Sequence, residues 1–194
     1  MNVTSATSAS ESDRERTTAT LVAAFVSDPL IRWMFPDPRQ YFLYFPQVLK
    51  YYAGRAFDNQ SAYRSEDFRA TALWLPPGVS PDEEALGRVM EEGRDEKLLG
   101  EVFAVLEQAG GSHPQVEHWY LPTIGVDPQC QGKGYGSVLL ARGLEVCDRD
   151  HMVAYLESTN PSNIPLYERF GFEVAGKIQA GGSPAITPMI RASR

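Results

Sequence analysis

The sequence predicts an α/β fold in which helices flank a mixed, twisted sheet with a parallel pair of strands at its centre. The second half of the chain alternates strand, glycine-rich loop, helix and strand, which is the order of a parallel crossover unit. A short helix and a final hairpin follow, so other strands of the sheet must pair antiparallel. The 194 residues are 43% hydrophobic and show neither an internal repeat nor a long linker. They are therefore expected to form a single domain over residues 1–194.

The first half of the chain is expected to be mainly helical. Residues 1–11 are rich in Ser, Thr and Ala and predict a short strand or a loose tail. Apolar spacing and proline stops then predict helices, with one proline-bounded segment left open as a short helix or a loop. These segments are 12–28, 30–38 (helix or loop), 40–53 and, as one helix or two, 81–108. Residues 61–64 and 69–75 are short and β-prone and predict a hairpin.

The second half carries the strands of the parallel pair. Strands are expected at 117–126 and 151–158, helices at 136–149 and 162–170, and the arms of a last hairpin at 172–179 and 185–190. Pro122 lies inside the first of these strands and has no N–H to donate to a neighbouring strand. We therefore expect a bulge, or a gap in the strand pairing, at this residue.

Composition and charge exclude several classes of protein. Lys and Arg number 18 against 25 Asp and Glu, a net charge of −7, whereas a nucleic-acid binder should show a basic face. The two cysteines, Cys130 and Cys147, are too few for a disulfide framework. No apolar run reaches the roughly 18 residues of a membrane span, and the first residues lack an export pattern. The sequence thus predicts a cytoplasmic protein without nucleic-acid or membrane partners.

Three alternating glycines, Gly132, Gly134 and Gly136, lie between the strand at 117–126 and the helix that follows it. Glycine lets the backbone come close to a ligand, and the first turn of a helix adds unpaired N–H groups and a positive dipole end. Such a loop is suited to a phosphate or pyrophosphate, although a flexible connection could have the same composition.

The loop departs from two other phosphate-binding motifs. A nucleotide-triphosphatase loop ends in G-K-[ST], whereas Lys133 is followed by Gly134 and residue 127 is not a glycine. A dinucleotide fingerprint needs a third glycine where Ser137 stands. Glu157, about 20 residues further on at a strand end, fits that fingerprint, so dinucleotide binding stays open as an alternative.

The segment Gln131-Gly-Lys-Gly-Tyr-Gly136 resembles the Q/R-x-x-G-x-G/A loop of the GNAT superfamily of acyl-CoA-dependent N-acetyltransferases. The later segment Asn163-Ile-Pro-Leu-Tyr167, followed by Gly171-Phe172, is similar to the second signature of that family. A helix and a strand separate the two motifs, as the family requires. The branch that contains puromycin N-acetyltransferase is the one most resembled, through QGKGYGS, LEST and LYERFGF. The resemblance extends from about Trp119 to the C-terminus, and in the first half it is limited to AAFVSDP.

The resemblance implies a GNAT fold, with the parallel strands splayed around acetyl-CoA as the cosubstrate and with no metal. Residues 116–194 would form the acetyl-CoA-binding core, and residues 12–110 would form the acceptor side. The amide of Val126 would hold the thioester carbonyl, and Lys133 would lie near a phosphate or face solvent. The residues implied to bind acetyl-CoA are Ile124, Val126, Gln131, Gly132, Lys133, Gly134, Tyr135, Gly136, Ser137, Asn163 and Tyr167.

Acetyl transfer to an amine needs a base for the amine proton and an acid for the departing thiolate. Glu157 ends the otherwise apolar segment MVAYLE, near the carboxyl end of a strand, where α/β sites gather. It is the predicted base, and a solvent-facing Glu at a strand tip is the alternative. Glu117, His118 and Tyr120 on the neighbouring strand are rivals for the same role. By resemblance Tyr167 is the candidate acid, unless it is only a core aromatic.

The acceptor pocket is expected to come from the first half of the chain. Asp28, Trp33, Phe35 and Asp37 cluster in a proline-bounded segment. Aromatic walls with acidic ends suit a cationic or aromatic amine, although the two aromatics could equally cover the core. The candidate substrate-binding residues are therefore Asp28, Trp33, Phe35 and, from the neighbouring strand, Tyr120.

These observations together predict an N-acetyltransferase that moves an acetyl group from acetyl-CoA to a small-molecule amine by direct attack, as a monomer or a homodimer. A non-catalytic acyl-CoA sensor or interaction module is the alternative from a different class, and acetylation of a peptide or protein amine is a further one. His113 and His118 have no further ligand at a suitable spacing, so no metal site is expected.

Overall fold

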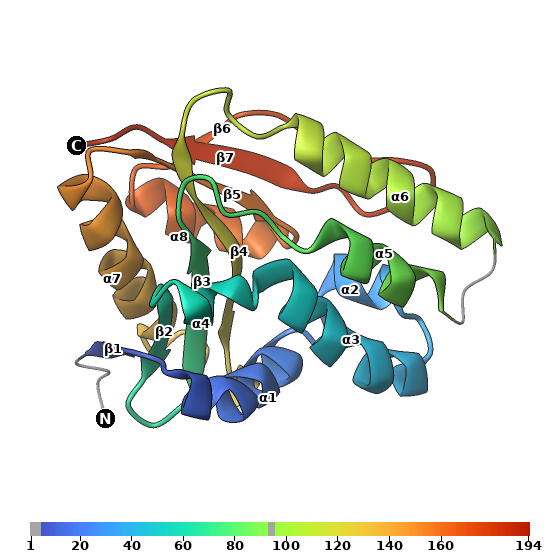
Figure 1. The fold of residues 1–194 in the computed structure, drawn as a ribbon, viewed down its shortest axis with the longest axis horizontal. Coiled ribbons are helices and arrows are strands. Elements are labelled where there is room, and N and C mark those ends of the chain that lie inside the picture. The colour runs from blue at the N-terminus through green and yellow to red at the C-terminus, as the bar shows by residue number, and fades with distance from the viewer. Residues whose placement is uncertain (1–4, 93–95) are drawn as a thin grey trace.

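The computed structural model describes residues 5–92 and 96–194 of the chain and is drawn in Figure 1. In these residues seven strands form one mixed sheet in the order β1-β2-β3-β4-β5-β7-β6. β4 and β5 are parallel, and the other neighbouring strands are antiparallel. The predicted mixed sheet with a parallel pair at its centre is thus confirmed. The strands are β1 Ala6–Ser8, β2 Ala62–Ser65, β3 Ala70–Leu75, β4 His118–Val126, β5 Val153–Ser158, β6 Glu173–Val174 and β7 Thr187–Arg191.

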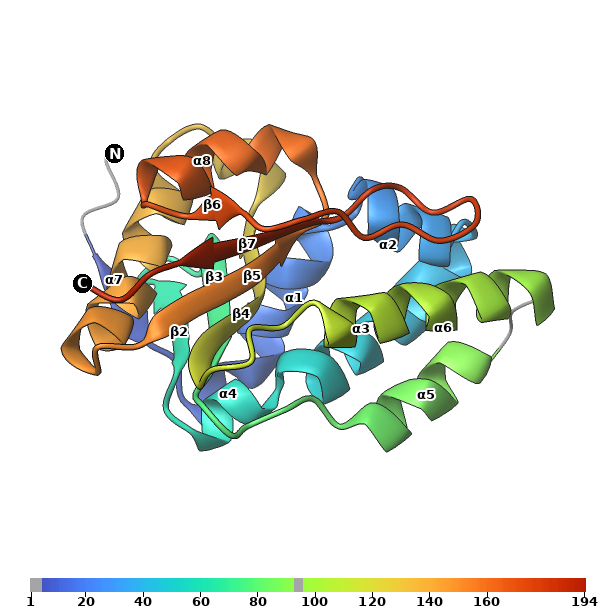
Figure 2. The ribbon, with the colours of Figure 1, turned by 90° about the horizontal axis from the view of Figure 1, so that it is seen from above.

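Helices cover both faces of the sheet. α7 and α8 lie on one face and α1 to α6 on the other, as Figure 2 shows from above. The helices are α1 Arg14–Ala24, α2 Pro29–Met34, α3 Pro38–Ala53, α4 Arg55–Asp58, α5 Glu83–Glu91, α6 Glu96–Gly111, α7 Tyr135–Arg149 and α8 Ile164–Arg169, with short 3-10 helices η1 Glu11–Asp13, η2 Pro128–Cys130 and η3 Pro161–Asn163. None of the helices described is long and apolar enough to span a bilayer.

Aspartate caps fix where helices begin in the first half of the chain. Asp28 Oδ1 accepts hydrogen bonds from two amides of α2, at 3.0 and 3.1 Å, and Pro29 supplies the first helical residue. The segment at 30–38, open between helix and loop, is therefore helical in its first half. Asp37 caps α3 and Asp82 caps α5 in the same way.

Two predicted segments contain residues outside the described ones. Within 1–11 the short strand expected is present as β1, and residues 1–4 lie outside the described residues. The segment at 81–108 forms two helices, α5 and α6, and residues 93–95 between them lie outside the described residues.

Pro122 marks the point where the sheet opens. The register between β3 and β4 shifts between Leu73 and Leu75, which is a bulge. The parallel pairing of β4 with β5 ends at Leu121, immediately before the proline. The predicted bulge and the predicted gap are therefore both present, and β4 separates from β5 beyond Leu121.

The last hairpin is less regular than predicted. Its first arm, expected over 172–179, is a strand only at Glu173–Val174, with one isolated bridge between Ile178 and Ile186. β6 is an edge strand of the sheet and both of its residues are exposed. The Ala-Gly-Lys segment that follows does not alternate apolar and polar residues, so it does not specify a pairing register with the second arm of the hairpin.

Candidate active site

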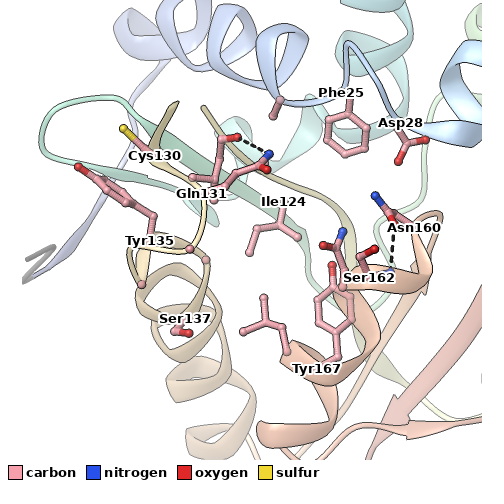
Figure 3. A pocket seen from close by; sticks show the side chains of 18 of the residues that line it. Phe25, Asp28, Ile124, Cys130, Gln131, Tyr135, Ser137, Asn160, Ser162 and Tyr167 are labelled. Atoms are coloured by element: carbon pink, nitrogen blue, oxygen red, sulfur yellow. Dashed lines mark hydrogen bonds between the residues drawn. The ribbon is translucent and has the colours of Figure 1, made fainter. Parts of the chain in front are cut away.

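A cleft of about 720 Å³ opens where β4 and β5 separate (Figure 3). Its walls are the end of β4, the glycine loop with the start of α7, the segment leading into α8, and the turn from α1 to α2. Lys133 was predicted either near a phosphate or facing solvent. It is not part of the cleft wall, and its Nζ donates to Gln129 O at 2.7 Å. The other ten residues predicted to bind acetyl-CoA line this cleft: Ile124, Val126, Gln131, Gly132, Gly134, Tyr135, Gly136, Ser137, Asn163 and Tyr167.

The glycine loop offers backbone N–H groups to the cleft. Gly132 and Gly134 have φ angles of 72° and 90°, in the left-handed region that favours glycine. The first hydrogen bond of α7 runs from Val138 N to Gly134 O at 3.2 Å, so the three amides before it have no partner inside the helix. α7 has 15 residues, and its dipole adds a positive potential at the same place. The loop and helix end therefore fit an anionic group such as a pyrophosphate.

The backbone of β4 turns further polar groups toward the cleft. The amide of Asp127 donates to Arg69 O, just before β3, at 2.8 Å. Because N–H directions alternate along a strand, the amides of Ile124 and Val126 point away from β3, into the gap beside β5. Both residues line the cleft. This orientation is the one that the predicted role of the Val126 amide requires.

Asn163 and Tyr167 reach the cleft from its other wall. Tyr167 is only 5% exposed, and its ring packs edge-on against Phe172. Its hydroxyl points into the cleft, as Figure 3 shows. Burial raises the pKa of Tyr167, so the hydroxyl carries its proton at neutral pH. The residue is therefore a core aromatic that also has a polar group available in the cleft.

A second, smaller cavity of about 90 Å³ adjoins the cleft. Residues of α2, α3, α5 and α6 enclose it, together with Pro122 and Thr123 of β4 and Glu157 of β5. Phe25 lines both cavities, and β4 passes from the second cavity at Thr123 to the cleft at Ile124. The two cavities therefore share Phe25 as part of their walls, and they follow each other along β4 beyond Leu121. We refer to the smaller one as the inner cavity.

Glu157 places a buried carboxyl group in the inner cavity. Its side chain is 7% exposed, Oε2 accepts a hydrogen bond from Tyr120 Oη at 2.5 Å, and Oε1 accepts one from Tyr155 Oη at 3.0 Å. Burial raises the pKa of Glu157 to about 7, although the tyrosine hydrogen bonds act to lower it. The solvent-facing alternative is therefore wrong. A carboxyl group that titrates near neutral pH is suited to accept the proton of an amine.

Of the three other residues considered as the base, Tyr120 contacts Glu157, His118 contacts its neighbour His113, and Glu117 is exposed. Tyr120 is buried, and burial together with the nearby carboxylate raises its pKa, so its hydroxyl keeps its proton. His113 Nε2 lies 3.5 Å from Glu157 Oε1, and His113 Nδ1 lies 3.0 Å from His118 Nε2. Burial lowers the pKa of His113 to about 4, so the ring is neutral at pH 7. Glu117 is exposed and lines neither cavity.

Three partners of Glu157 were not predicted from the sequence: Tyr52, Tyr155 and His113. Tyr155 could have been identified, because residues i and i+2 of a strand share one face. Tyr52 comes from α3 and shares a short hydrogen bond with Tyr120. No spacing in the sequence links Tyr52 or His113 to Glu157. In the described residues, no group of three or more His, Cys, Asp or Glu side chains is arranged to hold a metal ion.

The predicted acceptor residues are only partly at the cavities. Asp28 is 7% exposed, lines the cleft and accepts a hydrogen bond from Thr159 Oγ1 at 2.6 Å, and burial raises its pKa. Phe35 is 1% exposed and stacks on Tyr44, and Trp33 is half-buried against the same core. Neither of these two aromatics is among the described residues that line the cleft or the inner cavity. Trp33 and Phe35 therefore cover the core, which was the alternative to a place in the acceptor pocket.

Comparison with known proteins identifies the family. The family model described as Acetyltransferase (GNAT) family matches residues 47–172. The chain belongs to this family. The match starts well before Trp119, so the likeness includes part of the first half of the chain. The chain is accordingly an acyltransferase of the GNAT type, a family whose acetyltransferases use acetyl-CoA.

Relatives and solved structures agree with this family. An uncharacterized N-acetyltransferase of Schizosaccharomyces pombe is 29% identical over 175 residues, which cover 82% of this chain and 70% of that protein. A mycothiol acetyltransferase of Brachybacterium faecium is 37% identical over 87 residues, 43% of this chain and only 25% of that protein.

Two solved structures show the likeness in fold. A structure titled histone acetyltransferase HPA2 and related acetyltransferase, from Corynebacterium glutamicum, has a TM-score of 0.70 at 22% identity and covers 100% of this chain and 98% of that one. A polyamine N-acetyltransferase of Drosophila melanogaster has a TM-score of 0.65 at 15% identity, over 96% of this chain and 98% of that one. Both confirm the GNAT fold.

Proposed function

We propose that this GNAT protein transfers the acetyl group of acetyl-CoA to the amine of a small molecule by direct attack of that amine. The observation that carries the proposal is that the cleft and the inner cavity are neighbours along β4. Free loop amides line the cleft, the carboxyl of Glu157 lies in the inner cavity, and Phe25 is part of both walls. Relatives named N-acetyltransferase and mycothiol acetyltransferase support acetyl transfer. The solved structure of a polyamine N-acetyltransferase supports a small-molecule amine.

We assign one residue of the chain to each step of the transfer. An alkylamine arrives mainly as ammonium, because its pKa lies near that of lysine, about 10.4. The carboxylate of Glu157 takes the ammonium proton, which frees the nitrogen lone pair for attack on the acetyl carbon. The amide of Val126 donates to the thioester oxygen, where negative charge develops. The hydroxyl of Tyr167 gives its proton to the sulfur as the carbon–sulfur bond breaks, and the second proton that the nitrogen loses on becoming an amide restores the tyrosine hydroxyl. Bound acetyl-CoA supplies the thioester.

Calorimetric titration with acetyl-CoA, with NAD as the control ligand, is the first test. We expect micromolar binding of acetyl-CoA and no heat with NAD, because the glycine pattern departs from the dinucleotide fingerprint at Ser137. CoA release in the presence of amines then measures turnover. Binding of NAD in place of acetyl-CoA, or no binding of either by folded protein, would refute the assignment of the cleft.

The alternatives give different outcomes in the same measurements. A non-catalytic acyl-CoA sensor would bind acetyl-CoA but release no CoA with any amine. The inner cavity, at about 90 Å³, favours a small amine over a peptide or protein amine as acceptor. Membership of the branch that contains puromycin N-acetyltransferase, and a cytoplasmic location, stay predictions of the sequence.

A further inference from the structure

We infer, on the basis of the proposed function, that the inner cavity selects amines with one positive charge and a short apolar substituent, and that it rejects diamines and polyamines. Pentylamine represents the accepted class. Its counterpart 1,4-diaminobutane has the same number of non-hydrogen atoms and a second amine in place of the terminal methyl group.

The wall of the inner cavity is almost wholly apolar. Of the 18 described residues that line it, 14 are apolar, and the rest are Tyr52, Thr123, Glu157 and Thr159. Two of these polar groups already have partners, because Tyr52 shares a hydrogen bond with Tyr120 and Thr159 donates to Asp28. Glu157 accepts from Tyr120 and Tyr155, but a carboxylate has about four acceptor sites, so Glu157 and the unpartnered Thr123 can still recognise a polar part of a ligand.

Glu157 is the one ionisable carboxyl among those 18 residues. It can neutralise a single ammonium group, and its side chain is 7% exposed, so the attraction acts away from bulk water. A second ammonium group on the substrate would lose its hydration without gaining a carboxylate, which is costly in an apolar space. The charge of the cavity therefore matches a monoamine.

Thr123 supplies the second contact for the same nitrogen. Its Oγ1 is buried and has no hydrogen-bond partner in the described residues, and the residue lines the inner cavity. Buried hydroxyl groups in proteins are nearly always hydrogen-bonded, so this one is suited to accept an N–H from a bound amine. Thr123 immediately precedes Ile124, which lines the cleft. The nitrogen is thus held at the cleft end, and the substituent extends toward Met90 and Val105 on the helical side.

The volume of the inner cavity limits the substituent. An apolar cavity of about 150 Å³ in another protein holds benzene, or roughly 25 Å³ for each carbon atom. By the same ratio, the 90 Å³ present here holds about four carbon atoms. The flexible side chains of Met34 and Met90 are part of the wall and can adjust to one carbon more.

Rates and binding with a series of unbranched amines, from ethylamine to octylamine, test this inference. We expect kcat/KM for CoA release to rise about fourfold with each methylene group up to butylamine or pentylamine, and then to level off or fall. At pH 7.5 we expect 1,4-diaminobutane to be at least about 100-fold poorer than pentylamine. A diamine that equals or exceeds pentylamine, or rates that do not depend on chain length, would overturn the inference while leaving acetyl transfer intact.

A binding measurement separates this inference from the proposed function. If no amine releases CoA, acetyl transfer to amines fails, but thermal stabilisation by pentylamine and not by 1,4-diaminobutane would still support the monoamine site. If neither amine binds, the inference is overturned as well.

A pair of variants places the selectivity in the inner cavity. Ala109 lies on α6 and is a half-buried part of the wall, so Ala109→Glu adds a second carboxyl group there. We expect Ala109→Glu to shift the ratio of kcat/KM values toward the diamine by at least about tenfold relative to Ala109→Gln, which adds the same bulk without charge. Equal ratios in the two variants would show that the amine binds elsewhere. Leu106→Glu, compared with Leu106→Gln, repeats the test from a second half-buried wall position.

Discussion

The hydroxyl of Tyr120 donates a hydrogen bond to Glu157 Oε2 across 2.5 Å, and the two residues come from the two parallel strands. The register sets Tyr120 opposite Tyr155, and Glu157 follows two residues later on the same face of β5. The carboxyl group is therefore held by two tyrosines just beyond the point where the strands lose contact. Its burial and its hydrogen bonds oppose each other, and the balance leaves its pKa at about 7.

The acid limb of the pH–rate profile should report this balance. Glu157 accepts a proton only as the carboxylate, so kcat/KM should fall as the pH drops below about 7. The hydrogen bond from Tyr120 lowers the pKa of Glu157, and Tyr120→Phe should therefore move the acid limb to higher pH. Tyr63→Phe, on β2 in the opposite core, is the control and should leave the limb in place. A limb that stays still or moves to lower pH in Tyr120→Phe would contradict the assignment of Glu157.

Glu157→Gln should change how stability depends on pH. The folded state raises the pKa of Glu157 from 4.5 to about 7, so folding favours the protonated form and the wild-type protein loses stability as the pH rises through this range. Gln is neutral throughout, so the variant should gain about 3 kcal/mol relative to wild type between pH 4.5 and pH 8. Chemical denaturation at several pH values measures the difference. Glu107→Gln, at an exposed position of α6, is the control. A difference in free energy of unfolding between Glu157→Gln and the wild-type protein that does not vary with pH would refute the buried carboxylate.

Features encoded over short stretches of chain could be predicted from the sequence. The positions of Gly132 and Gly134 follow from a backbone conformation that only glycine adopts easily, and both line the cleft. Pro122 predicts the opening of the sheet because proline has no N–H to donate, so strand pairing is interrupted at that residue. Glu157 was identifiable as the one acid at the end of an apolar strand segment.

Features that depend on how distant helices pack could not be predicted in this way. α2 turns Ile31 and Met34, three residues apart, toward the inner cavity, so Trp33 falls outside that face. Phe35 follows the last residue of the helix and turns into the core. A segment that could be either helix or loop does not define a face, so the sequence could not decide between the acceptor pocket and a cover of the core for Trp33 and Phe35.

Tyr167→Phe tests the acid. The change removes the hydroxyl in the cleft and keeps the ring that packs against Phe172. We expect kcat to fall at least about tenfold and the Kd for acetyl-CoA to change by less than about threefold, because the thiolate loses its proton donor while the binding surface stays. Tyr44→Phe, which lies in the core beside Phe35, is the matched control. An unchanged kcat would transfer the role of the acid to another group or to water.

Gly143 on α7 should tolerate no side chain, because the indole ring of Trp74 packs directly against it. A Cβ at this position would stand 2.1 Å from Nε1 and 2.2 Å from Cε2 of Trp74, a fully buried and rigid side chain of β3. Gly143→Ala should therefore lower the free energy of unfolding by about 3 kcal/mol or more. Gly100→Ala on α6 meets no atom within 4 Å and should raise it by up to about 1 kcal/mol, through the better helix propensity of alanine.

The cause of the Gly143→Ala effect can be isolated with a second change. If the ring is responsible, Gly143→Ala should lower the free energy of unfolding much less in the Trp74→Leu background than in the wild-type protein. The loss in the double variant should therefore be smaller than the sum of the losses in the two single variants. Denaturant unfolding of the four proteins measures this coupling. Additive losses would mean that the close packing of α7 on β3 is not what requires glycine at this position. The first turn of α7 lines the cleft, so we also expect Gly143→Ala to weaken acetyl-CoA binding and Trp74→Leu to restore part of that affinity in the double variant.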